Sequence, residues 1–462
     1  MSTIQRREHG SIDMTQGRPL GLLATFSLPL LLGNVLQQMY NMVDSMVVGN
    51  FVGKDALTAV SVGFPIVFLL SSLFIGLSMG ATIMIAQYIG AGDREQVSRT
   101  VNTICAGMMI VILPLTLLGL LVTVPMLRLT NVPAEAFEDA RVYCLVVFAG
   151  LIGTFGYNVN TGIMQGLGDS KTPLIFLAVA CVINIILDLV FVLVFSWGVF
   201  GVAFATIIAQ FCSWIFGVAY INRKYSYIHI RIFSFKVDRD LLRQLVRLGV
   251  PSGVQQCQFS VAIILMQALI NGFGSDFAAG FAAANKIDSF AFMPIQSFAV
   301  AVTTFVGQNV GAGRLDRVKH GTRSALVLSV AVCAAISAVV VPLRRELLML
   351  FNQDPAVVLA GEDYLVRVLS PMFVLAAQFT LNSVLRGAGS TVVPMISSII
   401  ALWGARVPAA YLLAWMFPGA PGNLYWSYLI GWLVGFAITG VVYLRGRWKD
   451  KCVVAGQTIR VE

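Results

Sequence analysis

The feature that most constrains this chain is a series of apolar runs, each long enough to cross a lipid bilayer, separated by short polar segments. A transmembrane helix needs about 20 mostly apolar residues, and reading for such runs gives twelve. Charged residues make up only 11% of the chain, against about 25% in soluble domains. The sequence therefore predicts an all-α membrane protein with twelve spans, over 19–48, 56–87, 98–124, 137–163, 172–196, 199–222, 243–271, 277–308, 322–343, 356–385, 392–416 and 423–445.

The positions of Lys and Arg predict how these spans are oriented. Cytoplasmic loops of membrane proteins carry an excess of both residues. When the N-terminal tail is placed in the cytoplasm and the spans alternate, most of the 31 Lys and Arg residues fall on the cytoplasmic side. Both termini are therefore predicted to be cytoplasmic. The basic residues form short clusters between apolar runs, not an aromatic-interleaved patch, so no nucleic-acid partner is expected.

The two halves of the sequence repeat at an offset of 221 residues. Each half has six spans, so both copies enter the membrane from the same side, as parallel repeats do. The predicted organisation is a cytoplasmic tail (1–18), a first lobe (19–222), a basic cytoplasmic linker (223–242), a second lobe (243–445) and a C-terminal tail (446–462). Two lobes related by a pseudo-two-fold axis suit alternating access, whereas a channel more often uses identical subunits. The matching pairs are Gln87-Tyr-Ile-Gly-Ala-Gly92 with Gln308-Asn-Val-Gly-Ala-Gly313, Gly166-Leu-Gly168 with Gly387-Ala-Gly389, Asp55 with Asp276, and Tyr143 with Tyr364.

Two carboxylates inside the first lobe suggest a cation site. A charge at the bilayer centre costs about 2.5–3.5 kcal/mol on insertion scales, so Asp44 and Asp188 need a reason to be there. Asn184 shares a helix face with Asp188, and Thr206 lies at a similar depth in the next span. Such oxygens could hold Na⁺ or exchange protons. The alternative is that they only hydrogen-bond the helices together.

The remaining polar residues in the spans are less specific. Gln37 and Tyr40 lie near Asp44, where aromatic and acidic side chains would suit an apolar cation. Lys286 and Asp288 are two residues apart and point to different faces, so structural anchoring and substrate contact both remain open. Arg406 is interpreted as structural or as reaching towards an interface.

At these residues the chain resembles the MATE family, the multidrug and toxic compound extrusion transporters, over nearly its whole length. The resemblance is to the prokaryotic DinF-like and MepA-like branch. It is carried by Leu28-Pro29, Tyr40-Asn-Met-Val-Asp44, Asp55-Ala-Leu-Thr-Ala-Val60, Gln165-Gly-Leu-Gly-Asp169, Asn184-x-x-x-Asp188 and the repeated Gln-x-x-Gly-Ala-Gly motif.

The resemblance implies two six-helix lobes in a V, in a bacterial inner (plasma) membrane. It also implies export of cationic or amphipathic drugs in exchange for H⁺ or Na⁺ by a functional monomer surrounded by lipid. The residues that match the coupling site of the branch, where Na⁺ would also bind, are Asp44, Asn184, Asp188 and Thr206. Pro29 matches the proline at which the first span bends, and Gln37 and Tyr40 match substrate-binding positions in the cavity. Either Asn158 or Asn160 matches a further cavity position late in span 4. The NorM-like branch uses acids in its seventh and tenth helices. Span 7 of this chain has Gln255 and Gln256 at this point and no carboxylate, which argues against a site in the second lobe.

Other classes of protein fit the sequence less well. A related flippase for lipid-linked intermediates would share the two-lobe plan, but it typically has fourteen spans and a cationic cavity. A membrane enzyme would need a nucleophile, base or metal cluster near an interface. The seven cysteines and three histidines form no metal-binding pattern. No enzyme activity and no cofactor other than the coupling ion is therefore expected.

Overall fold

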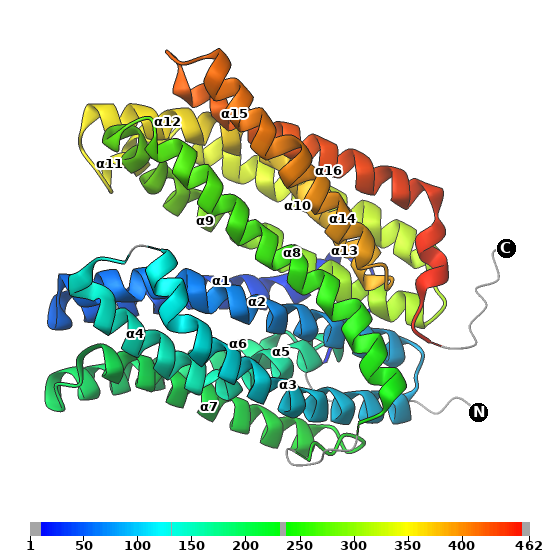
Figure 1. Ribbon diagram of the computed structural model, residues 1–462. Helices are drawn as coiled ribbons and strands as arrows, with labels where there is room; N and C mark the ends of the chain where they lie inside the picture. The colour runs from blue at the N-terminus through cyan, green and yellow to red at the C-terminus, as the bar shows by residue number, and fades with distance from the viewer. Residues whose placement is uncertain (1–10, 131, 232–236, 455–462) are drawn as a thin grey trace, which may run out of the picture. The chain divides into compact units, whose positions relative to one another are not determined.

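A computed structural model of the protein describes residues 11–130, 132–231 and 237–454, and within these ranges it contains helices and no strands. The predicted tails and linker lie partly outside the described residues, at 1–10, 232–236 and 455–462. The elements are α1 (Pro19–Val47), η1 (Val48–Val52), α2 (Lys54–Gly90), α3 (Arg94–Leu129), α4 (Ala134–Ala149), α5 (Leu151–Gly166), α6 (Lys171–Leu189), η2 (Val190–Val194), α7 (Gly198–Lys224), α8 (Arg239–Asn271), α9 (Ser275–Gly311), α10 (Leu315–Val340), α11 (Arg344–Met349), α12 (Pro355–Leu369), α13 (Met372–Gly387), α14 (Val392–Ile399), η3 (Ile400–Arg406), α15 (Val407–Met416), η4 (Pro421–Tyr425), α16 (Trp426–Arg445) and η5 (Arg447–Lys451) (Figure 1).

The helices confirm the all-α membrane fold. Ten helices of the described chain are long and apolar enough to cross a membrane, and two helix pairs reach that length together. The pair α4 and α5 bends by 52° and the pair α12 and α13 by 46°, so counting each pair as one span gives the predicted twelve. The first bend lies at Gly150, where a Cβ atom would overlap the side chain of Ile207. The second lies at Pro371, which has no N–H group to continue the helix.

The described chain divides into two compact units that nearly follow the sequence halves. Unit 1 contains residues up to Asp13 and Leu32–Gly253, and unit 2 contains Met14–Leu31 and Val254 onwards. The first half of α1 therefore belongs to the second unit, and the first half of α8 belongs to the first unit. The chain changes unit once before α1, between Asp13 and Met14, and twice inside helices, shortly after Pro29 in α1 and shortly after Pro251 in α8.

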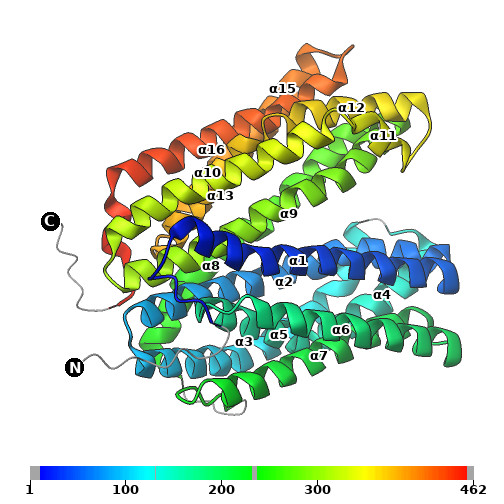
Figure 2. The ribbon, with the colours of Figure 1, turned by 180° about the vertical axis from the view of Figure 1, so that it is seen from behind.

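Unit 1 is built around α2, which packs against α3, α4 and α5. Helices α5 and α6 in turn pack against α7, and Figure 2 shows these three side by side. The first half of α8 approaches α2 closely at two pairs of glycines. A Cβ atom at Gly76 would overlap the backbone of Gly253, and one at Gly80 would lie 3.0 Å from the Gly249 nitrogen. Helix backbones can approach this closely only where both surfaces lack side chains.

Unit 2 is built around α9, which packs against α10, α12 and α13. The repeated glycine motif ends α2 and α9 in the same way, with Gly92 at φ +75° and Gly313 at φ +72°, a conformation that favours glycine. The segment before α1 is bound to the end of α9. Met14 donates its N–H to Gln308 Oε1 at 2.9 Å, and its carbonyl accepts from Asn309 Nδ2 at 2.9 Å.

Candidate functional site

The polar residues predicted to form a cation site lie on three helices of unit 1. Helix α1 supplies Tyr40 and Asp44, α6 supplies Asn184 and Asp188 one turn apart, and α7 supplies Thr206. In Figure 2 the second half of α1 runs alongside α6, and Tyr40 of α1 reaches Thr206 of α7. Asn184 and Asp188 are 1% and 0% exposed, although they sit on a helix that is otherwise almost wholly apolar.

The two carboxyl groups meet directly at this site. The side chains of Asp44 and Asp188 lie within hydrogen-bonding distance of each other. An ionised carboxylate only accepts hydrogen bonds, so a hydrogen bond between the two groups forms only when the pair carries a proton. Asp44 Oδ1 and Asp188 Oδ1 are buried and have no partner among the described residues. These two oxygens are therefore free to bind a proton or to coordinate a small cation.

Neighbouring groups hold the carboxyl pair in place. When the Asn184 amide is oriented to satisfy both of its ends, Nδ2 donates to Asp188 Oδ2 at 2.9 Å and the oxygen accepts from the Thr206 N–H at 3.2 Å. Tyr40 donates its hydroxyl to Thr206 Oγ1 at 3.3 Å. The structure thus joins Tyr40, assigned to substrate binding from the sequence, to the predicted coupling residues.

A five-residue π-helical turn follows each carboxylate. Turn η1 begins four residues after Asp44, and η2 begins two residues after Asp188. Such turns often occur at functional sites, because the wider turn changes the direction of the side chains around it. Both turns contribute to one apolar cluster, which also holds residues from α1, α2 and α7: Val47, Val48, Ala56, Val60, Val192, Val199 and Val202. Apolar surroundings strengthen electrostatic interactions at the site.

The structure adds Tyr143 of α4, which the sequence had marked only as a repeat match. It packs against the apolar cluster and lies close enough to Asp44 and Tyr40 to interact electrostatically with both. A tyrosine facing an acid across two spans could not be found from one helix at a time. The available signal was its recurrence as Tyr364.

The other predicted site residues make their hydrogen bonds to groups other than the carboxyl pair. Gln37 donates to Asn41 Oδ1 at 3.3 Å on its own helix. Asn158 is half-buried and donates to the Thr154 carbonyl at 2.8 Å. Asn160 is 2% exposed and donates to the Trp214 carbonyl at 2.8 Å, which ties α5 to α7. Pro29 is buried inside α1, and it belongs to unit 2, whereas Asp44 belongs to unit 1.

Solved structures of similar fold cover nearly the whole chain. The chain superimposes with a TM-score of 0.88 and 22% identity on a structure described as the outward-facing conformation of a multidrug resistance MATE family transporter of the MOP superfamily, covering 97% of this chain and 99% of that one. It superimposes with a TM-score of 0.86 and 23% identity on MATE in the bent conformation, covering 96% and 98%.

Sequence comparisons agree with the fold. The chain is 30% identical over 443 residues to the probable multidrug resistance protein YpnP of Bacillus subtilis, covering 95% of this chain and 97% of that protein. It is 26% identical to the probable multidrug resistance protein NorM of Thermotoga maritima, covering 95% of each. The MatE family model matches twice, over residues 29–190 and 251–412, one copy in each half. With two family copies in a helical membrane fold, the chain belongs to the MATE family of multidrug efflux transporters.

Proposed function

We propose that this protein exports cationic or amphipathic drugs by alternating access, in exchange for H⁺ or Na⁺ that binds at Asp44 and Asp188. The observation that carries the proposal is the carboxyl pair itself, hydrogen-bonded inside a membrane span with two buried, unpartnered oxygens. Two ionised carboxylates in contact repel each other. A proton or a monovalent cation relieves this repulsion, and its release restores it.

The proposed cycle uses this change of charge. From the outside, H⁺ or Na⁺ enters the pair, with Asn184 and Thr206 supplying further oxygen atoms. Neutralisation removes the attraction of the pair for a cationic drug, which leaves outward. Release of the ion to the inside restores the negative charge. In this proposal the protein works as a monomer in a bacterial inner membrane, with both termini in the cytoplasm. Its substrates are drugs of the kind suggested by the relatives, which are named multidrug resistance proteins.

The test is ethidium efflux from purified protein in liposomes, under an imposed pH gradient or an imposed Na⁺ gradient, with Asp44→Asn in parallel. We expect one gradient to drive efflux by the wild-type protein and neither gradient to drive it in the variant. Wild-type rates in a folded Asp44→Asn protein would exclude the carboxyl pair as the coupling site. Absence of efflux under both gradients in folded wild-type protein would instead favour the lipid-flippase alternative.

A further inference from the structure

A second carboxylate lies beside a tyrosine in unit 2, and the proposed coupling site does not use it. Tyr143 and Tyr364 occupy equivalent positions in the repeat. Tyr143 lies close to Asp44, and Tyr364 donates its hydroxyl to Asp288 Oδ2 at 3.1 Å. The acids come from non-equivalent helices, α1 and α9. Each half therefore places an intramembrane acid next to the repeated tyrosine, and the acid comes from a different helix of the repeat in each half.

The tyrosine of this second pair is fixed by aromatic packing. Tyr364 is 1% exposed. Its ring makes edge contacts with Phe281, Tyr425 and Tyr428, at centroid distances of 5.3, 5.0 and 5.8 Å. Because the ring cannot turn away, its hydroxyl group holds one oxygen of Asp288 in a set direction. Asp288 itself is half-buried on α9.

No Lys, Arg or His side chain among the described residues forms an ion pair with this carboxylate. None of the ion pairs found there includes Asp288. Arg406 is near enough to attract it, but the guanidinium carbon lies 3.5 Å from the Tyr428 ring centroid, and Nε has no hydrogen-bond partner. The guanidinium of Arg406 thus packs on an aromatic ring and forms no ion pair with Asp288 among the described residues. Lys286 is exposed and lies over the Phe351 ring.

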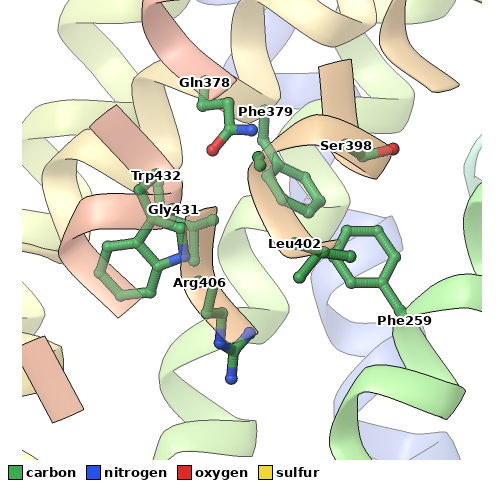
Figure 3. Close-up of a pocket in the computed structure, with 10 residues that line it drawn as sticks. Phe259, Gln378, Phe379, Ser398, Leu402, Arg406, Gly431 and Trp432 are labelled. Atoms are coloured by element: carbon green, nitrogen blue, oxygen red, sulfur yellow. The ribbon is translucent and has the colours of Figure 1, made fainter. Parts of the chain in front are cut away.

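Arg406 also borders a small cavity of about 30 Å³. Figure 3 shows Gln378 and the guanidinium of Arg406 at opposite ends of the lining residues, with Trp432 and Phe259 on the two sides. A cavity of this size holds roughly one or two water molecules. It is too small for a drug, so it cannot be the ligand site.

The chemistry around Asp288 fits an organic cation better than a metal ion. Within the described residues, no group of three or more His, Cys, Asp or Glu side chains could hold a metal. One carboxylate and one phenol are also too few oxygens for a hard inorganic cation. One turn further along α9, Phe292 lies on the same helix face and is half-buried. A negative charge beside an aromatic surface suits an ammonium or phosphonium group with an apolar body.

We propose that Asp288, oriented by Tyr364, is a substrate-binding carboxylate of the second unit that takes the charged group of an organic cation. Arg406 acts as its internal counter-ion and balances the carboxylate while the ligand is absent. The inference rests on the proposed export of cationic compounds. It is separate from ion coupling, because equilibrium binding needs no gradient.

The test measures equilibrium binding to purified full-length protein in detergent. Tetraphenylphosphonium serves as the permanent cation and triphenylphosphine oxide as an uncharged ligand of related shape. We expect Asp288→Asn to weaken tetraphenylphosphonium binding roughly tenfold, equivalent to about 1.4 kcal/mol, and to leave binding of the uncharged ligand unchanged. The control Lys286→Gln removes a neighbouring charge that points elsewhere, and it should bind both ligands as the wild type does. Equal loss of both ligands, or of neither, in folded Asp288→Asn protein would overturn the proposal.

A second variant tests whether Arg406 acts as a counter-ion of Asp288 or has only a structural role. Arg406→Gln removes the competing positive charge, so tetraphenylphosphonium should bind several-fold more tightly, with no change for the uncharged ligand. Unchanged or weaker cation binding in folded Arg406→Gln protein would contradict the counter-ion role.

A labelling experiment on the wild-type chain covers the case in which Asp288→Asn does not fold. Dicyclohexylcarbodiimide modifies carboxyl groups in apolar surroundings, and mass spectrometry locates the product. Tetraphenylphosphonium should protect Asp288 from labelling. Protection by Na⁺ alone, or by neither cation, would rule out an organic-cation site there. Failure of gradient-driven efflux with intact protection of Asp288 would count against the coupling mechanism and not against this site.

Discussion

At the scale of single residues, the proposed ion site at Asp44 and Asp188 makes a sharp prediction. Asp188→Asn keeps the shape of the side chain but cannot take up and release a proton or provide a negative charge. We expect the variant to fold, because Asn can still hydrogen-bond to Asn184 and Asp44. Gradient-driven ethidium efflux in liposomes should fall to the level of empty liposomes.

The matched control is Asp55→Asn, which removes an exposed acid in the first turn of α2. It should transport at close to the wild-type rate. If Asp188→Asn eluted as folded protein and still exported ethidium at the Asp55→Asn rate, the carboxyl pair would have no role in transport.

A second residue-scale prediction concerns Asp238, which lies outside the membrane at the start of α8. The backbone N–H of Leu241, followed by that of Asp240 and the guanidinium of Arg99, lowers the pKa of Asp238 from its ordinary value of 3.8. A lowered folded-state pKa stabilises the protein above the unfolded pKa, and this contribution is lost as the pH falls through the folded value. Asp238→Asn should therefore lower the Tm at pH ~7, and the difference from wild type should shrink below pH ~4.

Asp240→Asn tests whether that effect belongs to the capping carboxylate. Asp240 is exposed and adjacent, and its backbone N–H donates to Asp238 at 3.1 Å. Its substitution should leave the Tm near the wild-type value at both pH values. A Tm deficit of Asp238→Asn that stayed constant down to acid pH would refute the pKa argument.

At the scale of helices, the α2–α8 crossing depends on glycine. A methyl group at Gly76 would overlap the backbone of Gly253, which cannot move aside as a side chain could. Overpacking of this kind typically costs about 1–3 kcal/mol, so Gly76→Ala should lower the Tm of the detergent-solubilised protein. Gly21 is also helical but has nothing within 4 Å of its ideal Cβ position. Gly21→Ala should leave the Tm unchanged or raise it slightly; a loss as large as that of Gly76→Ala would show that the crossing is not the cause.

The sequence predicted which segments would be helices better than it predicted their local shape. Apolar length alone identifies a span, and the one-turn spacing of Asn184 and Asp188 places both on one face. The sequence does not predict the π-helical turns η1 and η2, because Val, Gly and Phe occur in both α-helical and π-helical turns. The bend at Gly150 depends on the distant side chain of Ile207. Features decided by contacts between helices cannot be derived from one helix at a time.

At the scale of the whole molecule, the repeat predicted two six-helix halves but not where the chain passes between the compact units. Residue patterns show where a helix begins and ends, and they do not show that one helix is divided between two units. Inside helices, the division falls at Leu31 and Leu32 in α1 and at Gly253 and Val254 in α8. Each lies just after an internal proline, Pro29 or Pro251. Under the alternating access proposed above, these two helices are the candidate hinges, alongside the link at Asp13 and Met14 before α1.

Proline inside a helix removes one backbone hydrogen bond and makes bending easier. Pro29→Ala and Pro251→Ala should therefore stiffen the two crossing helices. We expect each variant to express and bind tetraphenylphosphonium as the wild type does, but to export ethidium several-fold more slowly. Pro65→Ala is the control, since Pro65 lies inside α2, which stays within unit 1 throughout. If all three variants slowed export equally, the effect would belong to helix prolines in general. If neither Pro29→Ala nor Pro251→Ala slowed it, the hinges would lie elsewhere in the chain.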